Sequence, residues 1–574
     1  MSAERKIGVY VCHCGGNISD YVDVERVIAA VEGEPGVEIA RTAMFTCSDA
    51  TQQEIISDIA EHELDGMVVA SCSPKLHTAT FREVAKRAGL NPYEYTQVNI
   101  REQCSWAHTD DHEGATLKAI ELVRAGIAHT RLSEPLEPIE VETVPRALVV
   151  GGGIAGLRAA LGLAETGLEV FLVEREPELG GWVGHFGAIY PHDRDGHELI
   201  ATLERAVRAR DDITVFTGSE LVEKAGSFGN YVVTIAAGEE GERIQLEVGS
   251  IVVATGFDSY QPEAGELGYG IEGVVTLPEL EQLLLASDGE LHFNGKPVET
   301  IAYVYCVGSR QPGGHEYCSR FCCTAAVHDS LRIAERSPEV RQYHLYRDMR
   351  TYGRNELLYA ESRKRGSLYL RFPDSEPPEV EKLADGRLRV TVRDLLSGGE
   401  ELAIEPDLLV LVTGAVPRPN EELTGVLKLP LDKDGFFNEI HPKLRPVETV
   451  VDGVLIAGAC QSPKSASESV TSALAAVTQS ASILKKGTAE LDPLVAIVDP
   501  ELCTWCGKCA EACPFDAIQQ TSLNGKQVAG IEAAGCKGCG GCTPVCPEDA
   551  IDLQGYTGAQ IRAMIDGLLE GAAS

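Results

Sequence analysis

A group of four cysteines lies in the middle of the chain, within the stretch CVGSRQPGGHEYCSRFCC (306–323). Their spacing is C-x11-C-x3-C-C, and the residues are Cys306, Cys318, Cys322 and Cys323. Thiols grouped in this way can hold zinc, form a redox disulfide or ligate an iron–sulfur cluster. A disulfide uses only two cysteines, and adjacent cysteines are sterically awkward to bridge. The spacing therefore favours one [4Fe–4S] cluster, with a redox disulfide as the alternative.

Two further cysteine runs near the end of the chain repeat one pattern. CTWCGKCAEACP (503–514) and CKGCGGCTPVCP (536–547) both have the spacing C-x2-C-x2-C-x3-C-P of a bacterial two-cluster ferredoxin. In that spacing, three thiolates hold one [4Fe–4S] cluster and the fourth crosses to the other. The doubled pattern favours iron over zinc, which also accepts four thiolates. The predicted ligand sets are Cys503, Cys506, Cys509 and Cys546 for one cluster, and Cys536, Cys539, Cys542 and Cys513 for the other.

A glycine-rich fingerprint occupies ALVVGGGIAGLRAALGLAETGLEVFLVERE (147–176). An apolar strand runs into a G-x-G-x-x-G turn, and a helix, a second strand and an acidic residue follow. The glycines allow close approach to a pyrophosphate, the helix N-terminus offers amide donors, and the acid can bind ribose hydroxyls. A glycine turn with only a structural role is the alternative. The predicted dinucleotide contacts are Gly151, Gly153, Ile154, Ala155, Gly156, Glu174 and Arg175.

Later segments favour FAD over NAD at this site. Gly180 and Gly181 follow the second strand, a pattern seen in flavoproteins with two dinucleotide domains. IVVATGF (251–257), which contains Thr255 and Gly256, is an apolar strand that ends in Thr-Gly. The segment 453–477, with Gly458 in its turn, is expected to pass the ribityl chain and the isoalloxazine. Lys464 precedes the predicted helix 465–477, where a cation would shift the flavin potentials; a solvated lysine is the alternative.

The N-terminal region alternates short strands with helices. Strands are predicted at 8–14, 37–47 and 66–72, each running into a cysteine, with helices at 23–31 and 51–64. This alternation predicts a parallel sheet, whose carboxyl edge is where such sheets place their ligands. Four of five thiols there are expected to hold a further cluster, for about four clusters in all; buried or incidental thiols are the alternative. The candidates are Cys12, Cys14, Cys47, Cys72 and Cys104.

Length, charge and cysteine usage set the remaining expectations. A chain of 574 residues predicts several domains, here placed at 1–134, 145–488 and 491–555, with a terminal helix at 556–574. A net charge of −37 argues against nucleic acid as a partner. No apolar stretch reaches the roughly 18 residues of a membrane span. Eighteen cysteines without a secretory signal indicate metal or redox ligands in a cytoplasmic protein.

The motifs together resemble the A subunit of heterodisulfide reductase, the flavin subunit of methanogens and its bacterial homologues. The resemblance rests, in chain order, on VCHCGGNISDYVDV, NIREQCSWAH, GGGIAG, CVGSRQPGGHEYCSRFCC, YRDMRTYG and the double ferredoxin pattern. It implies a thioredoxin-reductase-like FAD domain, a cluster on the cysteines of 306–323, and flavin-based electron bifurcation. The longer archaeal form carries an additional ferredoxin inserted in its FAD domain, and nothing similar lies between Phe216 and Ile251 here.

The resemblance also implies partners and leaves three functions to compare. The implied partners are B- and C-like heterodisulfide reductase subunits, ferredoxin, and a hydrogenase-, formate- or NADH-linked input subunit, with a dimer inside the larger complex. The functions are electron bifurcation or confurcation, a pure electron relay, and an NAD(P)H-dependent disulfide oxidoreductase. The strand ETIAYVY (299–305) leads into the cysteine stretch with no second G-x-G-x-x-G, which counts against the third.

Overall fold

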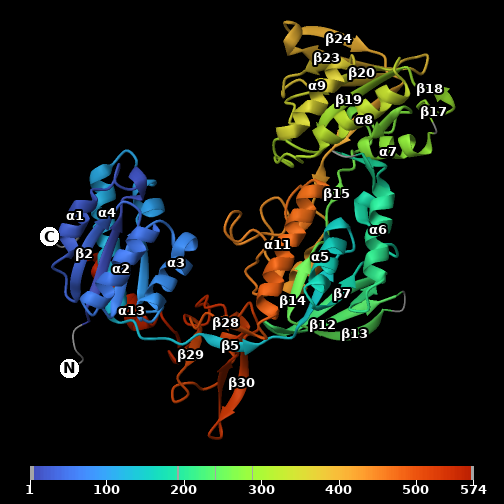
Figure 1. Ribbon diagram of the computed structural model, residues 1–574. Coiled ribbons are helices and arrows are strands. Elements are labelled where there is room, and N and C mark those ends of the chain that lie inside the picture. The colour runs from blue at the N-terminus through green and yellow to red at the C-terminus, as the bar shows by residue number, and fades with distance from the viewer. Residues whose placement is uncertain (1–4, 191–192, 239–240, 288, 570–574) are drawn as a thin grey trace. The chain divides into compact units, whose positions relative to one another are not determined.

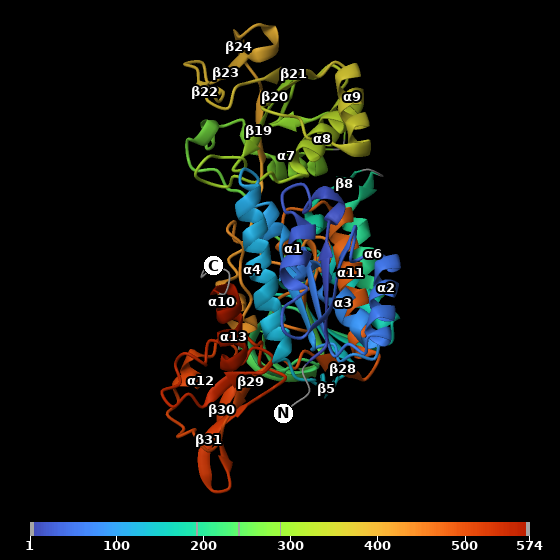
Figure 2. The same ribbon diagram turned by 90° about the vertical axis from the view of Figure 1, so that its left-hand side faces the viewer.

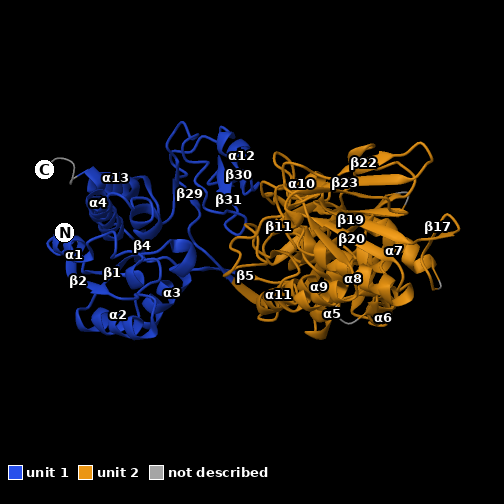
Figure 3. Ribbon diagram, turned by 90° about the horizontal axis from the view of Figure 1, so that it is seen from above, with its two compact units in different colours: residues 1–140, 490–574 blue, residues 141–489 orange. Residues whose placement is uncertain are grey.

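The structure is a computed structural model that describes residues 5–190, 193–238, 241–287 and 289–569. The chain folds as two compact units, which Figure 3 colours separately. One unit comprises residues 1–140 and 490–574, and the other comprises residues 141–489. Both ends of the chain therefore contribute to the same unit. Within the described ranges, no helix is long and apolar enough to cross a membrane.

The N-terminal part of the first unit is a four-stranded parallel sheet between helices. Its elements are β1 (Ile7–Cys12), α1 (Val24–Val31), β2 (Val37–Ala43), α2 (Asp49–Glu61), β3 (Gly66–Ser71), α3 (Pro74–Arg87), β4 (Tyr95–Asn99) and α4 (His112–Arg131). The strand order is β2-β1-β3-β4. Val9 and Val11 of β1 pack with α1 and α4, whereas Tyr10 packs with α2 and α3. Because helices cover both faces, β1 and β3 are buried along their whole length.

The C-terminal part of the first unit consists of short strands and two helices. They are β29 (Ala496–Val498), α12 (Lys508–Ala512), β30 (Ile518–Leu523), β31 (Lys526–Ile531), β32 (Ile551–Leu553) and α13 (Gly558–Leu569). β30 and β31 form a hairpin whose turn residues, Asn524 and Gly525, both have positive φ. α13 packs along α4, where the Gln560 amide donates to the Leu132 carbonyl at 3.1 Å. Residues 570–574 of the predicted terminal helix lie outside the described part.

The second unit begins with a lobe built on the parallel sheet β10-β7-β6-β14-β27. The bounds in this lobe are β6 (Arg146–Val150), α5 (Ile154–Glu165), β7 (Glu169–Val173), α6 (Gly196–Arg208), β10 (Ile213–Phe216), β11 (Ser219–Ser227), β12 (Asn230–Ala237), β13 (Glu242–Val248), β14 (Ser250–Val253), α10 (Glu421–Leu427), β27 (Val454–Ile456) and α11 (Ala466–Leu484). Ala147 and Val149 face α5 and α11, whereas Leu148 and Val150 face the antiparallel sheet β11-β12-β13. Figure 1 shows α5 between α11 and α6.

A second lobe repeats this plan around the sheet β16-β25-β19-β20-β21. Its bounds are β16 (Val274–Thr276), α7 (Leu277–Ala286), β19 (Thr300–Val307), α8 (Cys322–Arg336), β20 (Arg341–Tyr346), α9 (Glu356–Lys364), β21 (Leu368–Arg371), β22 (Glu379–Lys382), β23 (Leu388–Asp394), β24 (Glu400–Ile404) and β25 (Leu408–Thr413). Tyr303 and Tyr305 face the helices α7 and α8, and Val304 faces β23. Figure 2 shows the helices and β22-β23-β24 on opposite sides of this sheet.

Two short strands link the lobes of the second unit. β15 (Asp258–Ser259) and β26 (Ala415–Val416) pair in antiparallel fashion, and Arg418 donates to Asp258 at 3.0 Å beside them. The predicted mixed α/β class with parallel sheets is confirmed. Several predicted boundaries differ from the structure. The strand predicted at 37–47 ends at Ala43, and the helix predicted at 465–477 continues to Leu484.

Candidate redox centres

The glycine fingerprint forms an open cradle at the start of α5. Gly151 has a φ of 111°, and a side chain on Gly156 would lie 1.7 Å from the Gly151 carbonyl oxygen. Both positions therefore require glycine to close the turn. Gly153 is the N-cap of α5 and no side chain caps this helix, so the first amides of Ile154 and Ala155 point out of an uncapped N-terminus. Such a terminus favours a pyrophosphate.

Glu174 and the second glycine pair close the cradle from the other side. The buried Glu174 carboxylate accepts hydrogen bonds from the backbone N–H groups of Gly152 and Glu176, which ties the turn to the end of β7. Gly180 donates to the Gly152 carbonyl at 2.9 Å, so Gly180 and Gly181 lie against the turn. Arg175 is half-exposed and pairs with Glu176. The carboxylate keeps unused lone pairs for a ribose hydroxyl.

The loop after β14 carries a buried hydroxyl that has no partner. Thr255 Oγ1 is inaccessible to water and makes no hydrogen bond with the described residues. Gly256 follows with a φ of 77°, and nothing lies within 4 Å of the side chain that it lacks. Gly458 approaches α5 so closely that a side chain would lie 2.8 Å from Ala155. An unsatisfied buried hydroxyl beside an open glycine is what a bound cofactor would complete.

Lys464 lies just before α11, next to a buried thiol. Its Nζ donates to Gln461 Oε1 and Ser462 Oγ, both at 3.0 Å. Burial lowers the pKa of Lys464, and the neighbouring Cys460 and Glu439 act in the opposite direction. Cys460 is fully buried in the core of this lobe. Lys464 is therefore a half-buried cation at the start of α11.

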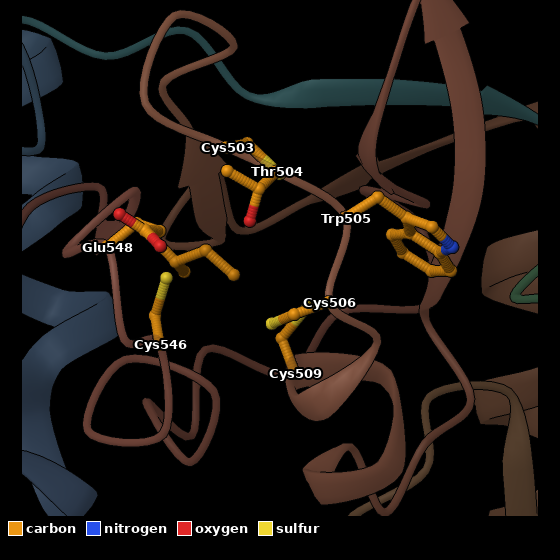
Figure 4. Close-up of a pocket in the computed structure, with 8 residues that line it drawn as sticks. Cys503, Thr504, Trp505, Cys506, Cys509, Cys546 and Glu548 are labelled. Carbon is orange, nitrogen blue, oxygen red and sulfur yellow. The ribbon is translucent and has the colours of Figure 1, made fainter.

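The first ferredoxin repeat and the last cysteine of the second line one pocket. Figure 4 shows the sulfur atoms of Cys506, Cys509 and Cys546 directed towards the same space, with Cys503 at its edge. This is the grouping that the crossed ligation of a two-cluster ferredoxin needs. The pocket is completed by Thr504, Trp505, Glu548 and Ile551.

The second set of ferredoxin thiols is also brought together. Burial and, to a smaller extent, the neighbouring thiols of Cys536, Cys539 and Cys513 raise the pKa of Cys542 to about 11. Backbone N–H groups already donate to four of the ferredoxin sulfurs at 3.3 to 3.4 Å, as expected around cluster ligands. These sulfurs are Cys503, Cys513, Cys536 and Cys546. Soft thiolates with amide donors suit iron–sulfur clusters.

The four cysteines of 306–323 converge where β19 meets α8. Cys306 has a φ of 64° at the end of β19, where the register with β25 shifts. Cys322 and Cys323 lie in the first turn of α8. The hydrogen bond with Cys323 and burial raise the pKa of Cys322 most, and the nearby Cys306 and Cys318 also raise it. The hydrogen bond from Cys322 lowers the pKa of Cys323. Four thiols at one helix N-terminus fit one anionic cluster.

Two contacts join this thiol site to the dinucleotide lobe. Arg320, between Cys318 and Cys322, pairs with Glu468 in the first turn of α11. The rings of Phe321 and Phe257 lie 5.4 Å apart. Phe257 directly follows Gly256 of the cradle. The thiol site and the cradle are therefore neighbours within one unit.

Four of the five N-terminal thiols, Cys12, Cys14, Cys47 and Cys72, are linked by a hydrogen bond or by effects on one another's pKa. Cys12 Sγ accepts from the Cys14 and Thr46 amides. Burial, the Cys12 charge and the Cys14 charge raise the pKa of Cys47, whereas Arg101 lowers it.

Cys72 belongs to the same group. Burial raises the pKa of Cys72 to about 11, with Arg101, Glu102 and Cys14 among the charges beside it. Cys104 is buried in the same core cluster as Cys12; burial raises its pKa to about 11, and the charges that act on it are Lys118 and Glu121.

Sequence reasoning missed the arginines at these sites. Arg101 and Arg310 each donate to a cysteine sulfur, that of Cys14 and that of Cys306. The available signal was their position, because Arg101 stands in NIREQC three residues before Cys104, and Arg310 stands four residues after Cys306. The unpartnered Thr255 hydroxyl has no sequence signal beyond the Thr-Gly dipeptide.

Two sequence profiles and several curated proteins match the chain. The profile "4Fe-4S dicluster domain" matches residues 496–553, and "Pyridine nucleotide-disulphide oxidoreductase" matches residues 145–307. One of the iron–sulfur A subunits of the CoB–CoM heterodisulfide reductase of Methanopyrus kandleri is 37% identical, over 92% of this chain and 92% of that protein. The chain belongs to the family of heterodisulfide reductase A subunits. It is thus an oxidoreductase with a flavin-binding domain and a 4Fe-4S dicluster domain.

Other members of this heterodisulfide reductase family are similar over most of their length. The A subunit of the H2:CoB-CoM heterodisulfide,ferredoxin reductase of Methanothermobacter thermautotrophicus is 35% identical, over 90% of each chain. The alignment with the Methanopyrus protein spans 610 positions, more than the 574 residues here, so that relative carries segments that this chain lacks. Among solved structures, the T. acidophilum thioredoxin reductase matches with 17% identity and a TM-score of 0.41, over 59% of this chain and 99% of that one.

Proposed function

We propose that this heterodisulfide reductase family member carries one FAD and about four [4Fe–4S] clusters, and that it performs flavin-based electron bifurcation or confurcation. A bound flavin supplies exchange of two electrons with a donor and of single electrons with clusters. The observation that carries the proposal is the adjacency of the dinucleotide cradle and the thiol site of 306–323. Arg320–Glu468 and Phe321–Phe257 join them within one unit.

Different residues of the chain hold the FAD and each of the clusters. Gly153 and the α5 N-terminus take the pyrophosphate, Thr255 supplies a hydroxyl to the cofactor, and Lys464 sets a cation near the flavin end. The ferredoxin sets hold two clusters, and Cys306, Cys318, Cys322 and Cys323 hold a third. Because the charges that act on Cys104 are Lys118 and Glu121, whereas the other four thiols act on one another, we assign the fourth cluster to Cys12, Cys14, Cys47 and Cys72.

The names of the relatives support an assembly with redox partners. Those proteins are named for H2, F420H2, ferredoxin and the CoB–CoM heterodisulfide. For this chain we propose heterodisulfide reductase B- and C-like subunits, ferredoxin and a hydrogenase-, formate- or NADH-linked input subunit, with the chain as a dimer in the complex. A direct NAD(P)H-dependent disulfide reductase is disfavoured, because α8 of the second lobe begins at Cys322 and Cys323.

The flavin potentials separate bifurcation from a pure electron relay. In a spectroelectrochemical titration of the anaerobically purified protein, bifurcation requires crossed potentials, with the first electron added to the flavin at a far lower potential than the second. A relay flavin accepts its first electron at the higher potential. Iron analysis of the same sample should give about sixteen iron atoms per flavin. Uncrossed potentials would favour the relay, and about eight iron atoms per flavin would remove the two non-ferredoxin clusters.

A further inference from the structure

At the N-terminal thiol site, one arginine binds a cysteine sulfur and a carboxylate at the same time. Arg101 Nη1 donates to Cys14 Sγ at 3.4 Å, and Nη2 donates to Glu102 Oε1 at 2.8 Å. The guanidinium also lies 4.6 Å from the centre of the Trp106 ring. Glu102 is fixed in turn, because its other oxygen accepts from the Ser73 amide at 2.9 Å. The positive charge is therefore held in place beside the sulfur.

The thiol site of the second unit has the same arrangement on a different scaffold. Arg310 Nη1 donates to Cys306 Sγ at 4.0 Å, and Nη2 donates to Asp348 Oδ2 at 2.7 Å. The backbone of Arg310 has a φ of 57°, and its carbonyl accepts from Arg347 Nη1 at 2.9 Å. Both arginine side chains are only 15% exposed. A π-helical turn (Arg101–Ser105) and the loop after β19 thus each bring a mostly buried guanidinium to one candidate ligand sulfur.

The ferredoxin sulfurs show a different kind of donor. The hydrogen bonds to Cys503, Cys513, Cys536 and Cys546 come from backbone amides, which carry partial charges. A guanidinium carries a full charge that does not titrate near neutral pH. Reduction of a cluster adds one negative charge, and a nearby fixed positive charge stabilises that state, more strongly where water is excluded.

We propose that Arg101 and Arg310 raise the reduction potentials of the two clusters outside the ferredoxin domain, each by holding its charge against one ligand sulfur. The inference rests on the proposed function, because it needs clusters on Cys12, Cys14, Cys47 and Cys72 and on the cysteines of 306–323. Glu102 and Asp348 oppose the effect, since each places a negative charge against its arginine, and Glu102 also acts on the candidate ligand Cys72. Each arginine contacts a candidate ligand sulfur directly, and its carboxylate holds the arginine in position.

The test is a redox titration of the intact holoprotein, followed by EPR, for Arg101→Gln and Arg310→Gln. Each variant should keep its iron and flavin and should lower the equilibrium constant for one-electron reduction of one cluster at least about tenfold, a shift of about 59 mV. Arg101→Lys and Arg310→Lys should recover part of that loss because they keep the charge. Arg26→Gln is the matched control, because Arg26 pairs with Glu113 on the surface of the same N-terminal domain without a sulfur contact.

The carboxylate variants Glu102→Gln and Asp348→Asn keep the arginine and test the sign independently. Each should raise the potential of its own cluster, even if an arginine variant fails to assemble. Unchanged potentials in variants that retain full iron would overturn the inference and leave the proposed clusters standing. A wild-type protein with iron for the ferredoxin clusters alone would instead overturn the proposed function, and this inference with it.

Discussion

Gly153→Ala should separate the stability of the fold from its ability to bind flavin. A Cβ on Gly153 would have its nearest neighbours at 4.0 Å, the Gly180 carbonyl oxygen and Gly181 Cα, and its φ of −75° suits any residue. The flavin-free protein should therefore be as stable as the wild type or more stable by about 0.4–1 kcal/mol, because alanine restricts the unfolded chain. The added methyl group enters the space where the pyrophosphate meets the backbone.

The expected loss of flavin affinity follows from the cost of one extra methyl group in a packed contact. Overpacking costs about 1–3 kcal/mol, which corresponds to flavin binding about 5-fold to 150-fold weaker. The assay is a flavin titration of the apoprotein, followed by fluorescence, beside denaturant unfolding of the same apoprotein. Gly425→Ala, in α10 with nothing within 4 Å, is the matched control; it should leave flavin affinity unchanged and stabilise the apoprotein by about 0.5–1 kcal/mol, because alanine favours the helix.

Gly156→Ala should have the opposite effect on the stability of the apoprotein. Its Cβ would lie 1.7 Å from the Gly151 carbonyl oxygen, so the turn itself must shift and the apoprotein should lose stability. The reasoning fails if Gly153→Ala binds flavin with wild-type affinity. It also fails if Gly153→Ala destabilises the apoprotein as Gly156→Ala does, because Gly153 would then be a structural glycine.

Three further predictions concern buried titratable or ligating groups. Cys322→Ser or Cys323→Ser should lose about four iron atoms per flavin and keep the ferredoxin clusters; full iron together with loss of a titratable disulfide would favour a redox pair. Lys464→Gln should keep the flavin but shift its potentials in a spectroelectrochemical titration, and an unchanged curve would leave Lys464 with a structural role only. Burial lowers the pKa of His344 to about 3. The neutral imidazole should therefore contribute to the stability of the fold above the unfolded pKa of about 6.5, and this contribution should be lost as the pH falls. Between about pH 7.5 and about pH 5.5, the unfolding free energy of His344→Phe should therefore decrease by about 1.4 kcal/mol less than that of the wild type. An equal decrease in the two proteins would contradict this.

The sequence predicts best those parts of the fold that depend on residues a few positions apart in the chain. The turn from Gly151 to Gly156 and the doubled cysteine run specify local backbone geometry, so the dinucleotide domain and the ferredoxin are readable without a structure. Strand ends are less predictable. The strand that begins at Val37 stops at Ala43, and a short turn leads from it to α2, which Ser48 caps by accepting from the Thr51 amide.

The partition of the N-terminal thiols needs the three-dimensional structure. Cys104 is close in sequence to Arg101, yet the π-helical turn at Arg101–Ser105 buries it in the core beside Lys118 and Glu121. Arg101 meanwhile reaches Cys14, 87 positions earlier. Such long-range contacts depend on how the strands are ordered in the sheet. That order cannot be predicted from the spacing of the cysteines in the sequence. The same holds for the contact between Phe257 and Phe321 that brings the thiol site to the cradle.

Electron bifurcation is tested most directly by a coupling experiment with the purified complex. The complex receives its two-electron donor, ferredoxin and a high-potential acceptor, and the reduction of both acceptors is followed together under anaerobic conditions. Bifurcation predicts that ferredoxin is reduced only while the high-potential acceptor is also reduced, with equal numbers of electrons in the two products. Reduction of ferredoxin by the donor alone, or transfer of all electrons to one acceptor, would contradict bifurcation and assign the chain to simple electron relay.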